Sequence, residues 1–268
     1  LSAITDLPEK HPIVDILSSK NKIYISAIGA ITDLPFGILK LKDNYLIESH
    51  KISYINNIKE LMFENLDDNK LKDNYLVFSD PNFDSNSKIE KSDEFDISNS
   101  NLNENFYSSN FRSELSNSEF IELKYSAEEA KLIKNILGNQ ANIYTGDDAD
   151  ENYFYENIND IPASFVHFST HAYYSREFDN ADYKPFYIET GLALAGAKSL
   201  KKYKSIDERD GFYNGVEIST TNFENTKCVI LNACSTESGD YFYSEGRMSL
   251  RKAFQIAGAK RVISTQWP

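Results

Sequence analysis

Short apolar runs alternate with amphipathic stretches through most of the chain after residue 75. Apolar runs bounded by turn residues predict buried strands, whereas apolar residues three and four positions apart predict helices. The predicted strands are 75–79, 142–144, 164–170, 191–196, 228–233 and 261–265, and the predicted helices are 126–137, 148 to about 158 and about 245 to 257. Strand–helix units in this order favour a mostly parallel sheet with helices on both faces, which is an α/β fold.

The stretch 126–137 carries the clearest helix signals. Ser126 followed by Glu129 has the spacing of a capping box, and Gly138 is a typical residue at which a helix ends. Helical periodicity places four apolar side chains on one face, which we expect to be buried: Ala130, Ile133, Ile136 and Leu137.

The first part of the chain has a different pattern, in which short β-prone segments dominate. Strands are predicted at 23–28, 45–47 and 52–54, and the last two are expected to pair. We therefore expect an N-terminal β-rich part at residues 1–66 and an α/β core at residues 67–268. The chain starts at Leu1 rather than Met and stops at Pro268 directly after an apolar strand, so we expect a piece of a longer protein.

Residues 82–119 interrupt the α/β pattern. They are dominated by Asn, Ser, Asp and Glu and show no periodicity. This composition is typical of long surface insertions, because it supplies little apolar area to bury. The insertion is a candidate regulatory or cleavage loop, and an expanded loop without a role fits the same composition.

Composition excludes several classes of protein. At 268 residues, 41% of them hydrophobic, the chain is long enough to bury a sizeable core. A formal net charge of −13 disfavours direct nucleic-acid binding, because phosphate contacts need clustered Lys and Arg. Only two cysteines are present, which favours a reducing compartment over a disulfide framework. Since no apolar run has the length of a membrane span and no leader opens the chain, we expect a cytoplasmic protein without membrane contact.

Two chemically active side chains follow two predicted strands. His171 comes directly after the strand at 164–170, and Cys234 comes directly after the strand at 228–233. The carboxyl ends of parallel strands meet at one edge of a sheet, which is where such folds carry their sites. A free thiol is only about 3% ionised at pH 7, and a neighbouring imidazole can pair with the thiolate or take its proton. The backbone N–H groups of Ala172 and Cys234 are candidate donors to an oxyanion.

Other residues of the same types have plainer explanations. Cys228 and His167 lie inside predicted strands, so we expect both to be structural. A zinc site is disfavoured, because no set of four ligands has usable spacing. A nucleotide-binding domain is also disfavoured, because the chain lacks a Gly-rich phosphate loop. We expect no metal and no cofactor.

Several motifs then occur in a characteristic order. They are His-Phe-Ser-Thr-His171, Leu231-Asn-Ala-Cys234, Ser244-Glu-Gly246, Ala257-Gly-Ala-Lys260 and Ile263-Ser-Thr-Gln-Trp267, preceded by Leu34-Pro-Phe-Gly37 and Phe78-Ser-Asp-Pro81. Over residues 23–268 the chain resembles the CHAT family. These proteins are caspase-like cysteine peptidases, related to caspases and separase, and they often accompany helical TPR repeats.

The resemblance implies a caspase-like fold and a catalytic dyad of His171 and Cys234. It also implies that Asn232 lines the pocket for the residue before the cleaved bond. Ser264, Gln266 and Trp267 are implied to bind the substrate backbone. The family usually has Gly after the histidine and often Ser two positions before the cysteine, where this chain has Ala172 and Asn232.

Two functions remain open from the sequence. The first is a cysteine endopeptidase that cleaves a protein substrate under the control of a regulatory partner or a TPR region outside this chain. Its context is then bacterial defence, such as an RNA-guided CRISPR-associated complex, as the resemblance implies. The alternative is an inactive caspase-like scaffold, or a peptide-binding module, with a vestigial dyad.

Overall fold

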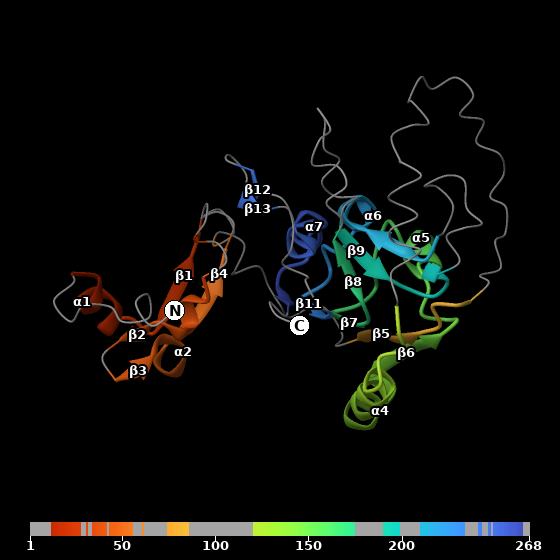
Figure 1. Cartoon of the computed structure of the whole chain (residues 1–268), viewed down its shortest axis with the longest axis horizontal. Helices are drawn as coiled ribbons and strands as arrows, with labels where there is room; N and C mark the ends of the chain where they lie inside the picture. The colour runs from red at the N-terminus through yellow and green to blue at the C-terminus, as the bar shows by residue number, and fades with distance from the viewer. Residues whose placement is uncertain are drawn as a thin grey trace, which may run out of the picture. The chain divides into compact units, whose positions relative to one another are not determined.

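The structure is a computed structural model, and it divides the chain into two compact units. One unit comprises residues 1–67 and 241–247, and the other comprises residues 68–240 and 248–268. Figure 1 labels most of the helices and strands of both units. The described residues are 12–27, 31, 34–41, 43–55, 61, 74–85, 120–174, 190–198, 210–233, 241–242, 246–247 and 249–264. Among them, no helix is both long enough and apolar enough to cross a membrane.

A five-stranded parallel sheet forms the centre of the larger unit. Its strands are β5 (Tyr75–Pro81), β6 (Ala141–Gly146), β7 (Phe165–Ser169), β11 (Cys228–Asn232) and β14 (Val262–Ser264). They lie in the order β14-β11-β7-β5-β6, and every neighbouring pair is parallel. The α/β fold expected from the sequence, with a mostly parallel caspase-like sheet, is therefore confirmed.

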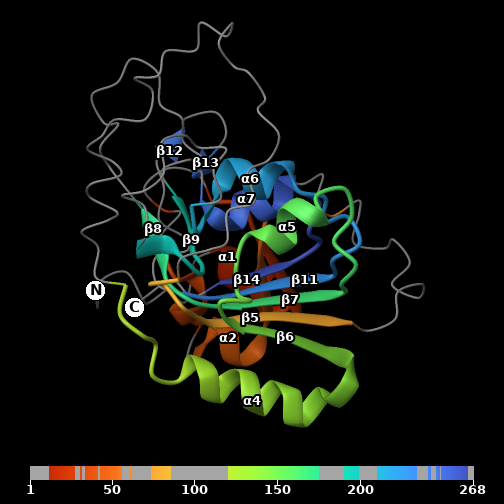
Figure 2. The same ribbon diagram turned by 90° about the vertical axis from the view of Figure 1, so that its right-hand side faces the viewer.

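Helices cover both faces of this sheet (Figure 2). The helix α4 (Ser126–Leu137) lies on one face. The helices α5 (Asn152–Glu156), α6 (Gly215–Thr220) and α7 (Leu250–Ile256) lie on the other. The helix predicted from about residue 245 begins only at Leu250, and 246–247 instead pair with 241–242 as the short antiparallel strands β13 (Gly246–Arg247) and β12 (Tyr241–Phe242).

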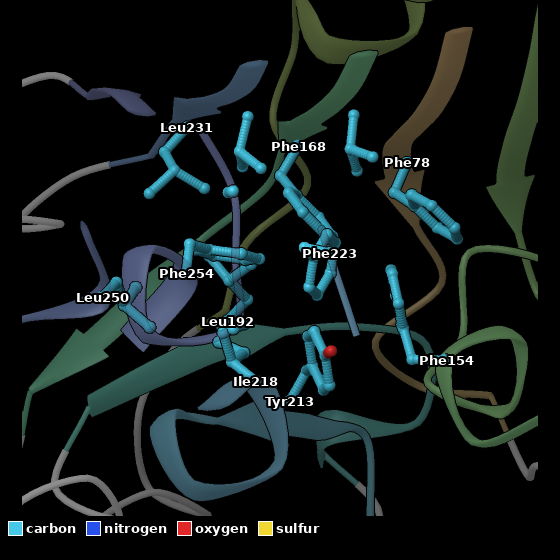
Figure 3. Packing of buried hydrophobic residues seen from close by; sticks show 14 of the residues in the cluster. Phe78, Phe154, Phe168, Leu192, Tyr213, Ile218, Phe223, Leu231, Leu250 and Phe254 are labelled. Atoms are coloured by element: carbon cyan, nitrogen blue, oxygen red, sulfur yellow. The ribbon is translucent and has the colours of Figure 1, made fainter. Parts of the chain in front are cut away.

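The hydrophobic core lies between the sheet and the helices α5–α7 (Figure 3). Side chains alternate between the two faces of a strand, so β5 and β7 direct Phe78 and Phe168 to the core. The ring of Phe78 lies 4.8 Å from that of Phe154 on α5, and the ring of Phe168 lies 5.7 Å from that of Phe254 on α7. These four rings are 1% exposed or less, and such burial is a main source of folding free energy.

A second, three-stranded antiparallel sheet continues from β7. It contains β8 (Ala172–Tyr174), β9 (Thr190–Ala193) and β10 (Phe212–Asn214), in the order β10-β9-β8. Only Thr170 and His171 separate β7 from β8. The chain therefore passes from the parallel sheet to the antiparallel sheet at His171.

Besides β12 and β13, the described part of the smaller unit contains short strands and short helices. They are α1 (Pro12–Ser18), β1 (Lys22–Ile25), β2 (Lys40–Leu41), β3 (Asn44–Tyr45), α2 (Leu46–Ser49) and β4 (Lys51–Tyr54), with a 3-10 turn, η2, at Phe36–Ile38. The strand predicted at 45–47 is wrong, because Leu46 and Ile47 lie in α2. Glu48 reaches back to accept the Tyr45 N–H (2.7 Å) and so stabilises the start of this helix. The strand β4 pairs instead with β1, in parallel, and β3 pairs with β2, in the antiparallel direction.

Candidate active site

His171 is anchored through both its backbone and its ring. Its carbonyl accepts the N–H of Ala193 on β9 (2.8 Å), and its Nε2 lies 2.8 Å from the carbonyl oxygen of Ile121. A carbonyl oxygen can only accept, so Nε2 carries the proton in this contact. The neutral imidazole is then the tautomer whose Nδ1 has a free lone pair. This is the form that can take a proton from a thiol.

Two phenylalanine rings pack against this imidazole. The ring centroid of His171 lies 5.4 Å from that of Phe83 and 5.6 Å from that of Phe120, and both phenylalanines are 5% exposed. The two phenylalanine rings also contact each other, at 5.8 Å. Together with the Ile121 carbonyl, they restrict both the plane and the rotation of the imidazole.

The neighbouring strand β11 leads to Cys234. Its last paired residue, Asn232, lies opposite Ser169 of β7, and Ala233 after it is buried. Cys234 is the next residue along the chain and lies outside the described residues, as do Gln266 and Trp267. The chain segments that lead to His171 and Cys234 are therefore adjacent strands of one sheet. The last rung of their ladder is the pair Ser169–Asn232, and each candidate follows its own strand's member of that pair by two residues.

Two other predicted site residues, Ser264 and Ala172, lie at or just after the same ends of the strands. Ser264 is the last residue of β14 and pairs with Leu231 of β11. Ala172 opens β8, where the Ala193–His171 hydrogen bond makes Ala172 and Leu192 a non-hydrogen-bonded pair. The N–H of Ala172 therefore points away from β9.

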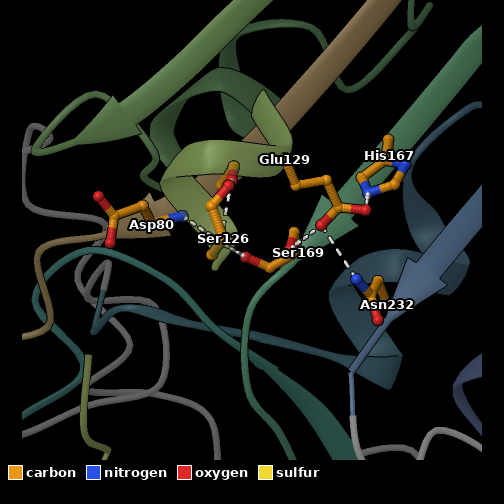
Figure 4. A network of polar contacts seen from close by, with 7 residues as sticks. Asp80, Ser126, Glu129, His167, Ser169 and Asn232 are labelled. Atoms are coloured by element: carbon orange, nitrogen blue, oxygen red, sulfur yellow. Dashed lines mark hydrogen bonds and ion pairs between the residues drawn. The ribbon is translucent and has the colours of Figure 1, made fainter. Parts of the chain in front are cut away.

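A polar network lies on the face of the sheet that α4 covers (Figure 4). Glu129 of α4 accepts two hydrogen bonds on Oε2, from Ser169 Oγ (2.6 Å) and from Asn232 Nδ2 (3.0 Å). Its other oxygen lies 3.3 Å from Nε2 of His167. Burial lowers the pKa of His167, and the nearby Glu129 carboxylate only partly opposes this shift. His167 is thus a neutral, structural histidine near neutral pH.

The second cysteine differs chemically from a reactive thiol. Cys228 is 7% exposed, and burial raises the pKa of its thiol, with a smaller opposite effect from Arg261. A buried thiol with a raised pKa reacts slowly. Cys228 is therefore an internal reference for the reactivity of Cys234.

The capping box predicted at the start of α4 is wrong. The residue before the helix is Tyr125, and no side chain caps it. Ser126 Oγ instead accepts the N–H of Asp80 (2.8 Å) and donates to the carbonyl of Ser169 (2.7 Å). The sequence therefore identified Ser126 and Glu129 as a notable pair, but it predicted hydrogen bonds within the helix. Their observed partners are residues at the ends of the strands.

Sequence reasoning missed the groups that orient His171. Ile121 acts through its backbone, for which a sequence carries no signal. Phe83 and Phe120 lie at the two borders of the polar stretch 82–119, where isolated aromatic residues were the only hint.

A comparison with protein-family models identifies the family of this chain. No curated protein matches the chain. The family model of the CHAT domain matches residues 8–268, which is nearly the whole sequence. The chain therefore belongs to the CHAT domain family, a family related to the caspase-like peptidases.

Proposed function

We propose that the chain is a cysteine endopeptidase in which Cys234 is the nucleophile and His171 is the general base and acid. The observation that carries the proposal is the state of His171. Its Nε2 donates to the Ile121 carbonyl, so Nδ1 is the unprotonated, basic nitrogen of the neutral ring. His171 itself lies two residues after the last described pair of the β7–β11 ladder, Ser169–Asn232. The next strand leads to Cys234 at the same edge of the sheet.

The reaction follows from these two side chains. The Cys234 sulfur gives its proton to His171 and attacks the carbonyl carbon of the substrate peptide bond, forming a tetrahedral oxyanion. The C–N bond then breaks as His171 returns the proton to the leaving amine, and a thioester remains on Cys234. A water molecule loses a proton to His171 and attacks the thioester, which releases the acid and restores the thiol.

Backbone groups at this edge suit the remaining tasks. The N–H of Ala172 points away from its own ladder and, with the N–H of Cys234, is our candidate oxyanion donor. The strand β14 is the outermost strand on its side of the described sheet. An edge strand can pair with an extended peptide, which supports substrate binding by Ser264, Gln266 and Trp267. Asn232 is proposed to contact the substrate residue before the cleaved bond.

The test is a cleavage screen on candidate partner proteins with matched variants. Cys234→Ala and His171→Ala should each lower the cleavage rate about a thousandfold or more, because the residues of a catalytic unit act together. Cys228→Ala is the matched control and should retain cleavage. Cleavage that persists in Cys234→Ala would refute the assignment. Binding of a partner by both wild type and Cys234→Ala, with no cleavage by either, would support the scaffold alternative.

We further propose that a regulatory partner or a TPR region outside this chain switches the activity. An unregulated protease is toxic to its own cell, and the family resemblance supports a role in bacterial defence, such as an RNA-guided system. Adding the candidate partner should then raise the cleavage rate of wild type and leave Cys234→Ala inactive.

A further inference from the structure

We propose that Glu129 is a positioning residue, whose carboxylate sets the spacing of β7 and β11 where these strands lead to His171 and Cys234. The inference rests on the proposed function, since it concerns the same two residues. Glu129 touches neither the imidazole nor the substrate in the proposed reaction, and it acts through the strands.

The geometry places one oxygen atom between two strands. Glu129 Oε2 accepts from Ser169 Oγ of β7 at 2.6 Å and from Asn232 Nδ2 of β11 at 3.0 Å. Ser169 and Asn232 are partners in the last rung of the β7–β11 ladder. Each lies two residues before a member of the proposed dyad.

Among the described residues, the pair Ser169–Asn232 is the last at which the main chains of β7 and β11 are joined. After Ser169 the chain leaves the parallel sheet, because Thr170 Oγ1 and the His171 carbonyl both bond to Ala193 of β9. In our proposal, the distance between the two chains beyond this pair depends on the side chains that bridge the ends of the strands. A shift of about 1 Å at reacting groups can lower a rate about a hundredfold.

The helix that carries Glu129 is itself fixed to the strand ends. Ser126, one turn earlier on α4, bonds to Asp80 N–H at the end of β5 and to the Ser169 carbonyl at the end of β7. Ser79 Oγ donates to the Ser126 carbonyl (2.6 Å), and both serines are buried. Because the first turn of α4 is fixed to β5 and β7 in this way, the Glu129 carboxylate can hold Asn232 of β11 at a fixed distance from β7.

Hydrogen-bond acceptance, and not charge, is the property that this role requires. Within the described part of the chain, no Lys or Arg forms an ion pair with Glu129, and its contact with His167 is to a neutral ring. A glutamine has nearly the same shape and keeps one acceptor oxygen. Glu129→Gln should therefore preserve the spacing, whereas Glu129→Ala should lose it.

The experiment measures the rate at which iodoacetamide labels Cys234 at pH 7 in the whole chain, resolved by peptide mass spectrometry with Cys228 as the slow reference. We expect His171→Ala to lower this rate about tenfold or more, since the imidazole activates the thiol. Glu129→Ala should lower it by a similar factor, and Glu129→Gln should stay within about threefold of wild type. The exposed Glu128 of the same helix provides the matched control, and Glu128→Gln should match wild type.

A double-mutant cycle separates positioning from a general loss of stability. If Glu129 acts through His171, the variant Glu129→Ala/His171→Ala should label no more slowly than His171→Ala alone. Thermal unfolding should show that each variant is folded at the temperature of the assay. If Glu129→Ala does not fold, Ser169→Ala removes one of the two bonds and should lower the labelling rate by several fold.

The outcomes distinguish this inference from the proposed function. If the labelling rate depends on His171 but is unchanged by Glu129→Ala, the positioning role is overturned and the dyad stands. Where Glu129→Ala does not fold, an unchanged rate in Ser169→Ala has the same meaning. Additive effects in the double mutant overturn the positioning role as well. A wild-type rate that does not depend on His171 overturns the dyad itself.

Discussion

The His171 imidazole is oriented by a carbonyl and two aromatic rings. Among the described residues, its ring contacts are the Ile121 carbonyl, Phe83 and Phe120, and none of these groups is ionised. In triads with an aspartate, the carboxylate both orients the imidazole and stabilises its charged form. Here the carbonyl dipole orients the ring but stabilises the positive charge of a protonated imidazole less than a carboxylate would. In the proposed dyad, the thiolate of Cys234 would therefore be the counter-ion of the protonated imidazole.

A second residue, Glu151, makes the stability of the larger unit depend on pH. Its side chain is 2% exposed, and it accepts the Gly211 N–H (3.3 Å). Burial, and then the nearby carboxylates of Asp210 and Glu217, raise its pKa well above the usual value. The folded state therefore holds this proton more tightly than the unfolded chain. The resulting stability is fully present below the unfolded pKa, about 4.3, and is lost as the pH rises through the folded pKa.

We therefore predict that Glu151→Gln weakens the fall in stability between about pH 5 and pH 8. The amide keeps an acceptor for Gly211 and cannot ionise, so the Tm at pH 8 should rise by a few degrees relative to wild type. The measurement is thermal unfolding across this pH range. The exposed Glu156 on α5 provides a control, since Glu156→Gln should leave the profile of wild type. A profile that is equally steep in Glu151→Gln contradicts the prediction.

At the scale of elements, α4 is attached to the sheet mainly at its first turn. Ser126 bonds to groups on β5 and β7, whereas farther along the helix Leu132 is 61% exposed and Ile136 is 79% exposed. Ala130 is the apolar residue of the helix that is fully buried. The first turn therefore contributes most of the specific contacts of the helix.

Removing the Ser126 hydroxyl should consequently be costly. Ser126→Ala leaves the Asp80 N–H and the buried Ser169 carbonyl without this partner, and each lost bond costs about 1–3 kcal/mol. We expect the free energy of unfolding to fall by about 2 kcal/mol or more, with an unchanged denaturant slope, in urea titrations. Ser219 of α6 bonds only within its own helix turn, so Ser219→Ala should change stability by less than about 0.5 kcal/mol. Equal effects of the two substitutions would contradict the role of Ser126.

The same helix shows how far the sequence could predict the elements. Its extent, 126–137, and its end at Gly138 were predicted correctly, because they depend on local periodicity and on a glycine with φ of 57°. The buried face was wrong at Ile136, and the capping box was wrong. The capping box was wrong because Ser126 and Glu129 bond to strand residues 40 or more positions away, and a local pattern cannot distinguish a cap from such contacts.

Short elements were the hardest to predict. The strands of the parallel sheet were found from their short apolar runs, although their ends differ from the predicted ones by up to two residues. In contrast, β8 and β10 have three residues each, and they exist only because β9 lies between them. Such strands depend on pairing with their neighbour, and this contribution is larger than the β propensity of their own residues.

At the scale of the whole larger unit, topology explains why the candidate site could be predicted in part. His171 and Cys234 follow adjacent parallel strands, so the strand pattern alone brought their chain segments to one edge. The surroundings of His171 could not be found in this way. They come from residues 83 and 120–121, which flank the polar stretch, and only the folded chain brings these two borders together.

The close approach of these borders leads to a last prediction. The rings of Phe83 and Phe120 are 5.8 Å apart, and residues 82–83 are bonded to the chain at 196–198. A linker of about eight Gly and Ser residues, spanning up to about 26 Å, should therefore replace 86–119 without moving either phenylalanine. The shorter loop should change the free energy of unfolding by only about +1 kcal/mol. Cys234 labelling by iodoacetamide should remain dependent on His171.

Two measurements on two replacements test this prediction. A Gly/Ser segment of the native length separates the effect of composition from the effect of length, and both replacements should unfold cooperatively in urea. We expect this outcome because the contacts that the structure describes for His171, with Phe83, Phe120 and the Ile121 carbonyl, lie outside the replaced stretch. If both replacements lose the His171-dependent labelling while they stay folded, 86–119 contributes directly to the site. In that event, the candidate regulatory role of the insertion becomes the first property to test.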